Sequence, residues 1–108
     1  MKIYNLKNFV RGWFIGNFEP TILKTKDFEI GIAHHKKGED WPKHYHKLAE
    51  EFNVLISGKM QIGETILNPN DIFVIEKMEA IKPHFLEDCT VLVVKTPSVP
   101  GDKYIVEE

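Results

Sequence analysis

Short runs of apolar and β-branched residues alternate with turn-forming residues along the whole chain. None of the runs has the 3.6-residue periodicity of a long helix, whereas runs of four to eight residues between turns are typical of strands. Counting them gives about eight to ten strands, the number that a jelly roll needs. The clearest runs lie at 9–15, 28–34, 52–56, 61–62, 65–66, 72–75 and 91–94. The pattern therefore predicts an all-β protein, a sandwich or a barrel.

Turn signals separate these runs and indicate how neighbouring strands connect. Gly63 and Glu64 join two short runs, and a two-residue loop with glycine first predicts a type II′ hairpin. Residues 68–71, Asn-Pro-Asn-Asp, predict a turn that leads into the strand at 72–75. Gly12 interrupts the apolar run at 9–15. Neighbouring strands of this kind pair in antiparallel fashion.

The pair His44 and His46 stands out as candidate chemistry. In an extended segment both side chains point to the same side. The linker that follows is long enough to reverse the chain, and Glu51 then opens a β-prone run, so a hairpin brings Glu51 beside His46. Two imidazoles and a carboxylate suit iron, manganese, nickel, copper or zinc, with positions left for water or substrate. The alternatives are an exposed polar strand face and a ligand role for Glu50, which projects oppositely from Glu51.

The residues Gly38, His44, His46, Glu51 and Gly58 resemble, in type and spacing, the first motif of the cupin superfamily. Cupins are small RmlC-like proteins with an antiparallel jelly-roll β-barrel, also called a double-stranded β-helix. The resemblance implies this fold for the chain, with residues 38–58 as the first motif. It also implies that His44, His46 and Glu51 bind a divalent transition metal: iron, manganese, nickel or zinc.

The second cupin motif is degraded in residues 68–96. The family pattern places a Gly before a strand, then a Pro, a Gly and a His. Here residues 76–78, Glu-Lys-Met, stand where the Pro and Gly are expected, and Ile81 or Lys82 falls near the expected His. His84 comes two or three residues late and reaches the site only if a loop or bulge absorbs the difference. The sequence favours a three-ligand site, with His84 as a further candidate ligand or a loop histidine.

The segments 12–16 and 94–104 extend the resemblance to a group of very short, single-domain cupins. They predict one cupin domain over residues 1–108, with an N-terminal strand or arm at 1–20. The wider superfamily includes sugar-nucleotide epimerases and isomerases, cupin-type phosphoglucose isomerases and iron dioxygenases. Two classes of function follow for the small molecule that the barrel would bind. One is a metalloenzyme of the isomerase, epimerase or dioxygenase type; the other is a non-catalytic binding module or sensor for a sugar, organic acid or metal.

Three further residues are candidates for the pocket: His35, Asn53 and Lys95. His35 belongs to an adjacent histidine pair of which only one member faces inward. Lys95 shares a strand face with Val91 and Val93, and is either a cation aimed into the pocket or an edge charge that prevents further strand pairing. In the enzyme hypothesis, His35 or Lys95 moves protons.

Composition excludes several classes of partner. With 108 residues and a net charge of −2, the chain has the size of one domain and no basic stretch, so we expect no nucleic-acid partner. No apolar run approaches 18 residues, so we expect no membrane partner. The polar N-terminal residues are unlike a signal peptide, and the single cysteine, Cys89, allows no intrachain disulfide. These features predict a cytoplasmic protein.

The strand that follows Glu51 also indicates an oligomer. Phe52, Val54 and Ile56 point opposite to Glu51, so they face outward if Glu51 faces the barrel interior. An apolar row on the outside needs cover, either from the N-terminal segment at 9–15 or from another subunit. The sequence predicts a homodimer.

Overall fold

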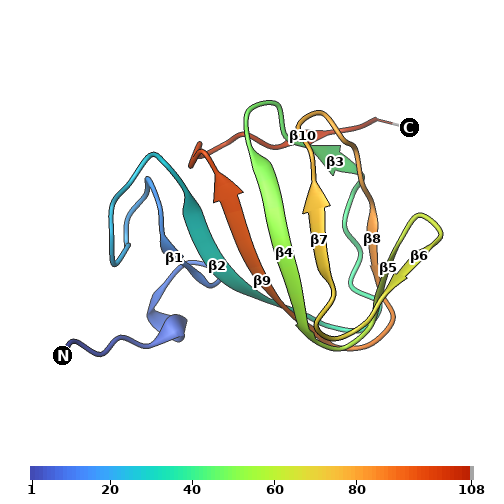
Figure 1. The fold of residues 1–108 in the computed structure, drawn as a ribbon, viewed down its shortest axis with the longest axis horizontal. Coiled ribbons are helices and arrows are strands. Elements are labelled where there is room, and N and C mark those ends of the chain that lie inside the picture. The colour runs from blue at the N-terminus through green and yellow to red at the C-terminus, as the bar shows by residue number, and fades with distance from the viewer. Residues whose placement is uncertain (108) are drawn as a thin grey trace.

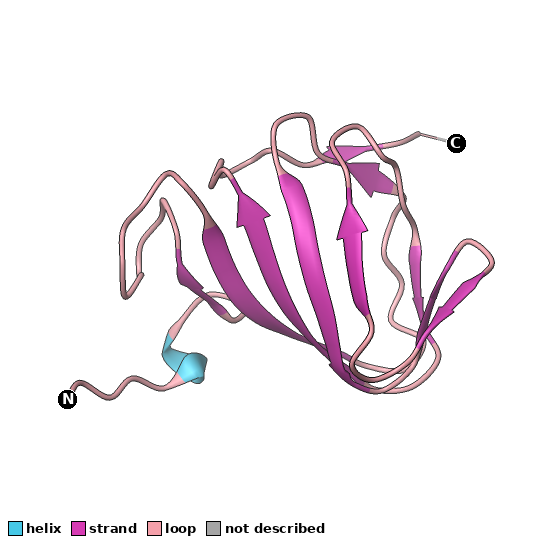
Figure 2. Cartoon of the chain, in the orientation of Figure 1, coloured by secondary structure: helices cyan, strands magenta, loops and turns pink. Residues whose placement is uncertain are grey.

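The computed structural model describes residues 1–107, and these form ten strands and one turn of 3-10 helix at Leu6–Asn8 (Figures 1 and 2). The strands are β1 (Trp13–Ile15), β2 (Glu29–His35), β3 (His44–Tyr45), β4 (Glu50–Ser57), β5 (Met60–Ile62), β6 (Thr65–Leu67), β7 (Ile72–Ile75), β8 (Pro83–Phe85), β9 (Cys89–Thr96) and β10 (Tyr104–Ile105). Within residues 1–107 no helix is long and apolar enough to cross a membrane. The all-β prediction is confirmed.

The strands form three antiparallel sheets. The large sheet has the order β1-β2-β9-β4-β7, and two small sheets have the orders β6-β5-β8 and β10-β3. In Figure 1 strands β5, β6 and β8 lie beyond β7, on the far side of the large sheet from the N-terminal arm, and β10 and β3 lie across the upper end of β7. Strand β9 lies between β2 and β4 although it comes last of the three in the chain, a connection typical of jelly rolls.

The inner face of the large sheet carries the core. Along β9, Val91 and Val93 are buried, and on the adjacent β4 Leu55 is buried completely. Their side chains pack with Met60 of β5 and Phe85 of β8, so the core fills the space between the large sheet and one small sheet. Each side chain of this size contributes about 1.5–3 kcal/mol when fully buried. The period-two alternation of β4 and β9 thus decides which face points inward.

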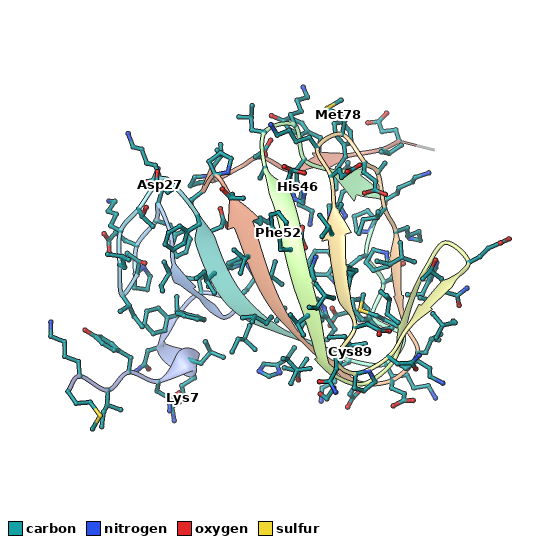
Figure 3. All side chains as sticks on the ribbon, in the orientation of Figure 1. Lys7, Asp27, His46, Phe52, Met78 and Cys89 are labelled. Atoms are coloured by element: carbon teal, nitrogen blue, oxygen red, sulfur yellow. The ribbon has the colours of Figure 1, made fainter. Side chains whose placement is uncertain are left out.

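The outer face of the large sheet is apolar and open. Phe52, Val54 and Ile56 project from β4 opposite to Leu55, and Phe52 is 40% exposed (Figure 3). On the neighbouring β7, Val74 pairs with Phe52 and is 46% exposed. Strand β1 extends the edge of the sheet instead of crossing this face. The N-terminal segment therefore does not cover the row, and the homodimer stays a prediction.

Two turns illustrate what local sequence dictates. The predicted hairpin at Gly63 and Glu64 is present: it joins β5 to β6, and Gly63 has φ +59°. The run at 9–15 differs from the expectation, because its strand is limited to Trp13–Ile15. A tight turn closed by the Trp13 N–H donating to the Val10 carbonyl (3.0 Å) takes up the residues before it.

Candidate functional site

Strand β4 supplies the carboxylate of the site. Glu51 and Asn53 point to the inner side of the large sheet, and both line a cavity of about 1040 Å³ between that sheet and the smaller ones. Glu50 lies one position away on the strand and is not among the residues that line the cavity. Between the two carboxylates of the first motif, the strand register selects Glu51.

The two histidines reach the same cavity from the segment that contains β3. Antiparallel bridging holds His44 on both sides, to Ile105 of β10 and to Ile81. The His44 ring donates from Nδ1 to the Pro42 carbonyl oxygen at 3.1 Å. Because that oxygen can only accept, the hydrogen is on Nδ1, and Nε2 is left with a free lone pair.

His46 is almost fully buried, at 4% exposure, and lies near the end of β4 (Figure 3). Its Nδ1 is 3.7 Å from Oε2 of Glu51, and its ring meets the His44 ring edge-on at 5.5 Å between centroids. The structure thus brings His44, His46 and Glu51 to the wall of one cavity.

A fourth residue, Asp102, fixes the conformation of the loop between His46 and Glu51. Its carboxylate accepts hydrogen bonds from three consecutive backbone N–H groups: Lys47 at 3.0 Å, Leu48 at 3.1 Å and Ala49 at 3.0 Å. Asp102 is only 6% exposed and lies more than fifty residues along the chain. The C-terminal segment therefore fixes the spacing between the ligand candidates on either side of the loop.

Electrostatics favour neutral imidazoles. Burial lowers the pKa of His44, and repulsion from Lys103 and Lys95 lowers it further. Burial, together with Lys95, lowers the pKa of His46 to about 4. Burial raises the pKa of Glu51, although Lys95 and the Asn53 amide act in the opposite direction. At neutral pH both histidines are in the form that binds metal.

The donor set fits a transition metal in type. Two neutral imidazoles and one carboxylate, with His44 fixed through its other ring nitrogen, are the ligands expected for iron, manganese, nickel or zinc. Metal–ligand distances near 2.1 Å imply donor atoms about 3 Å apart, and the His46–Glu51 separation of 3.7 Å is somewhat longer. Among residues 1–107 no three His, Cys, Asp or Glu side chains stand close enough to hold an ion as they are. Binding would therefore draw these side chains together.

Ile81, the residue bridged to His44 from the segment before β8, has no side chain that could bind a metal. The backbone of Ile81 pairs with that of His44 through two hydrogen bonds, of 3.0 and 2.9 Å, and Ile81 lines the cavity. His84 lies on β8 with its side chain exposed, whereas Pro83 and Phe85 on either side of it are buried and line the cavity. Strand β8 thus directs His84 away from His44, His46 and Glu51.

The other pocket candidates, His35, Asn53 and Lys95, all line the cavity. His35 forms a polar cluster: its Nδ1 donates to Oε2 of Glu39, which also accepts from Nε1 of Trp41 at 2.6 Å. The Trp41 bond, followed by the His35 bond, lowers the pKa of Glu39, so this carboxylate is ionised at neutral pH. Because Nδ1 donates, Nε2 of His35 is free to exchange a proton.

Sequence reasoning missed four residues of the site: Arg11, Glu39, Asp102 and Lys103. Three of them line the cavity, and Asp102 holds the loop behind it. Asp102 and Lys103 lie in the C-terminal segment that resembles the short cupins, and this was the one signal available for them. Arg11 and Glu39 stand in a turn and a loop without a recognisable pattern.

No protein-family model matches the chain, and no curated protein matches it. Several solved structures do match the chain. A protein with a double-stranded β-helix domain from Klebsiella pneumoniae is 19% identical, covers 99% of this chain and 93% of its own, and gives a TM-score of 0.72. A sugar phosphate isomerase of the cupin superfamily from Silicibacter pomeroyi is 21% identical over 76% of this chain and 58% of its own, with a TM-score of 0.63. The DMSP lyase of Ruegeria pomeroyi is 15% identical over 87% and 49%, with a TM-score of 0.72.

The chain therefore has the cupin fold, the jelly-roll double-stranded β-helix that its first motif predicts. At these identities the likeness concerns the fold alone. Proteins of this fold include an isomerase and a lyase, so the fold is compatible with several enzymatic or binding roles and selects none of them.

Proposed function

We propose that the protein is a small metal-binding cupin that binds or transforms a small molecule in its cavity. One observation carries the proposal: His44, His46 and Glu51 line a single cavity of about 1040 Å³. This volume is at the upper end of the range for small-molecule sites. We infer that these three residues hold a divalent iron, manganese, nickel or zinc ion.

Some residues of the chain would hold the metal, and others orient the side chains that bind it. A bound metal would supply a Lewis acid at the cavity wall. The Pro42 carbonyl orients His44, and the Asp102 carboxylate holds the loop that separates His46 from Glu51. The ligand candidates are therefore partly oriented before any metal binds, which lowers the conformational cost of binding.

The cluster of His35 and Glu39 favours proton transfer as the reaction. The ionised Glu39 carboxylate accepts from Nδ1 of His35 and so orients the imidazole. Nε2 is then placed to take a proton from a substrate and return it. This supports an isomerase or epimerase, because in these reactions moving a proton on and off the substrate is itself the chemical step.

A second candidate function is a non-catalytic binding module. It is favoured by Ile81, an apolar residue bridged to His44, because neither Ile81 nor Lys82, the residues near the expected fourth ligand, is a histidine. In this alternative the same cavity binds a small molecule, and His44, His46 and Glu51 form part of its wall without binding a metal.

Thermal unfolding of chelator-stripped protein, with manganese, iron, nickel or zinc added, tests the metal site. A metal at about 100 times its dissociation constant adds roughly 2.7 kcal/mol of stability, a shift of several degrees for this size. We expect His46→Ala to abolish the shift. His84→Ala is the matched control, since its exposed side chain lies outside the cavity, and we expect it to keep the shift.

Elemental analysis of the purified protein complements the melts. A stoichiometric transition metal in the wild type, lost in His46→Ala and retained in His84→Ala, would support the proposal. If none of the four metals shifts the melting temperature, the metal site is refuted and the binding module becomes the leading function.

A further inference from the structure

Besides Lys7 in the helical turn, three cationic residues from distant parts of the chain line the cavity. Arg11 comes from the turn before β1, Lys95 from the end of β9 and Lys103 from the residue before β10, and all three line the cavity. The whole chain has a net charge of −2. A local cluster of cations is therefore not a consequence of a basic composition.

These cations lack ion-pair partners in the part of the chain that the structure describes. Residues 1–107 contain three lysine–carboxylate ion pairs, and none of them includes Arg11, Lys95 or Lys103. Two other carboxylates that line the cavity already have partners: Glu39 accepts from His35 and Trp41, and Asp40 is 3.2 Å from the ammonium of Lys82.

The remaining carboxylate of the cavity is that of Glu51. Among residues 1–107 it forms no ion pair with any of the four cations that line the cavity, and its one ion-pair contact is with His46. Glu29 is also buried and pairs opposite Lys95 in the register of β2 and β9, but two carboxylates balance only part of the charge of Lys7, Arg11, Lys95 and Lys103. A group of like charges in a partly enclosed site repel one another, and an anion would relieve the repulsion.

Aromatic rings hold both ammonium groups without neutralising them. The Lys95 ammonium lies over the Trp13 ring at 5.1 Å from the centroid, and the Lys103 ammonium lies over Trp41 at 4.2 Å. A cation–π contact attracts the ammonium to the ring face and leaves its charge available to an oxyanion. The two indoles therefore pre-orient the lysines at the cavity.

The backbone at Arg11 is also unusual. Arg11 has φ +49°, a conformation uncommon for a residue with a side chain, and it precedes Gly12 at φ +84°. A Cβ on Gly12 would lie 1.9 Å from the Ile32 carbonyl oxygen, so the turn is tightly packed against β2. Backbone strain of this kind gathers at functional sites, and here it places a guanidinium at the cavity.

We propose that the ligand of the cavity is a small organic anion, and that Arg11, Lys95 and Lys103 bind its carboxylate or phosphate group. The inference rests on the proposed function, because it places this anion in the cavity of the metal candidates. Lys95 and Lys103 lie near enough to His44 and His46 to influence both imidazoles. The acidic group thus binds beside the metal ligands, and the aromatic walls contact the rest of the molecule.

Titration calorimetry of the purified protein with four anionic probes tests this site. Malonate and gluconate carry carboxylates, inorganic phosphate and glucose 6-phosphate carry phosphate, and glucose is the neutral control. We expect at least one anion to bind, with affinity falling as salt rises, and glucose to bind at least tenfold more weakly. A preference for the carboxylates or for the phosphates identifies the acidic group.

The double variant Lys95→Met and Lys103→Met keeps the aliphatic stems and removes both charges. Loss of a charge-assisted contact costs at least 1.4 kcal/mol, so we expect its anion affinity to fall by tenfold or more. Lys24→Met is the control, because Lys24 pairs with Glu19 instead of lining the cavity. Lys103→Met alone, a change at an exposed residue, tests the same point if the double variant does not fold.

Two results would overturn the inference: no binding of any of the four anions, or anion affinity unchanged in the lysine variants. The metal-dependent melting shift separates this failure from failure of the metal site. We expect the lysine variants to keep that shift, whereas His46→Ala loses it. A normal metal shift without anion binding would refute the ligand class and leave the metal site standing.

Discussion

Removal of the Asp102 carboxylate should destabilise the protein, because the carboxylate holds the loop between His46 and Glu51. The carboxylate accepts three backbone N–H bonds from Lys47, Leu48 and Ala49 and is nearly inaccessible to water. Hydrogen bonds to a charged acceptor contribute about 1.5–3 kcal/mol each, but such losses are not additive and water can enter a cavity left by alanine. We expect Asp102→Ala to lower the free energy of unfolding by about 3 kcal/mol, and Asp102→Asn by less, since one oxygen remains.

The effect should depend on pH. Burial alone would raise the pKa of Asp102, but the three N–H donors outweigh it and hold the pKa below its ordinary value. The ionised form is therefore favoured by folding, so its contribution is complete above the unfolded pKa of about 3.9 and is lost as pH falls through the lower folded pKa. The difference between wild type and Asp102→Asn should be constant near pH 7 and shrink below about pH 4.

Urea unfolding followed by circular dichroism at several pH values measures both quantities. Metal-dependent stabilisation should also weaken in Asp102→Ala, because the loop that it holds separates His46 from Glu51. A loss of stability below about 1 kcal/mol at pH 7, or a difference that persists unchanged at pH 2.5, would refute the structural role assigned to this carboxylate.

Two further predictions concern the sheet and its turns. Phe52→Lys with Val74→Lys should convert a dimer into a monomer in sedimentation at micromolar concentration, because both side chains lie on the exposed apolar face; a monomeric wild type would contradict the dimer. Gly58→Ala should cost more than about 2 kcal/mol in a denaturant melt, since Gly58 has φ +94° and its Cβ would lie 2.2 Å from the Asp88 carbonyl oxygen. Gly63→Ala, at positive φ but with open space, should cost about 1 kcal/mol, and equal losses would argue against the steric reason.

Local chemistry made the fold predictable from sequence. Strand residues alternate faces, so the β-prone run after Glu51 determined which side chains share its side of β4. Glycine first in a two-residue loop determined the hairpin at Gly63. The spacing of His44, His46 and Glu51 indicated the cupin fold for a similar reason: the motif is one strand, one loop and the next strand, and all its constraints lie within a short stretch of chain.

Contacts between residues that are far apart in the sequence determine the rest of the site. Asp102 reaches the loop at 47–49 because the C-terminal segment leads into β10, which pairs with β3, and no local pattern encodes that contact. The pairing of β8 with β5 turns His84 outward. Strand order likewise brings Lys95 beside Glu51, through the register of β9 on β4. A sequence pattern specifies side-chain direction within an element, whereas the charges that face one another across a cavity depend on how separate elements assemble, and only the tertiary structure determines that.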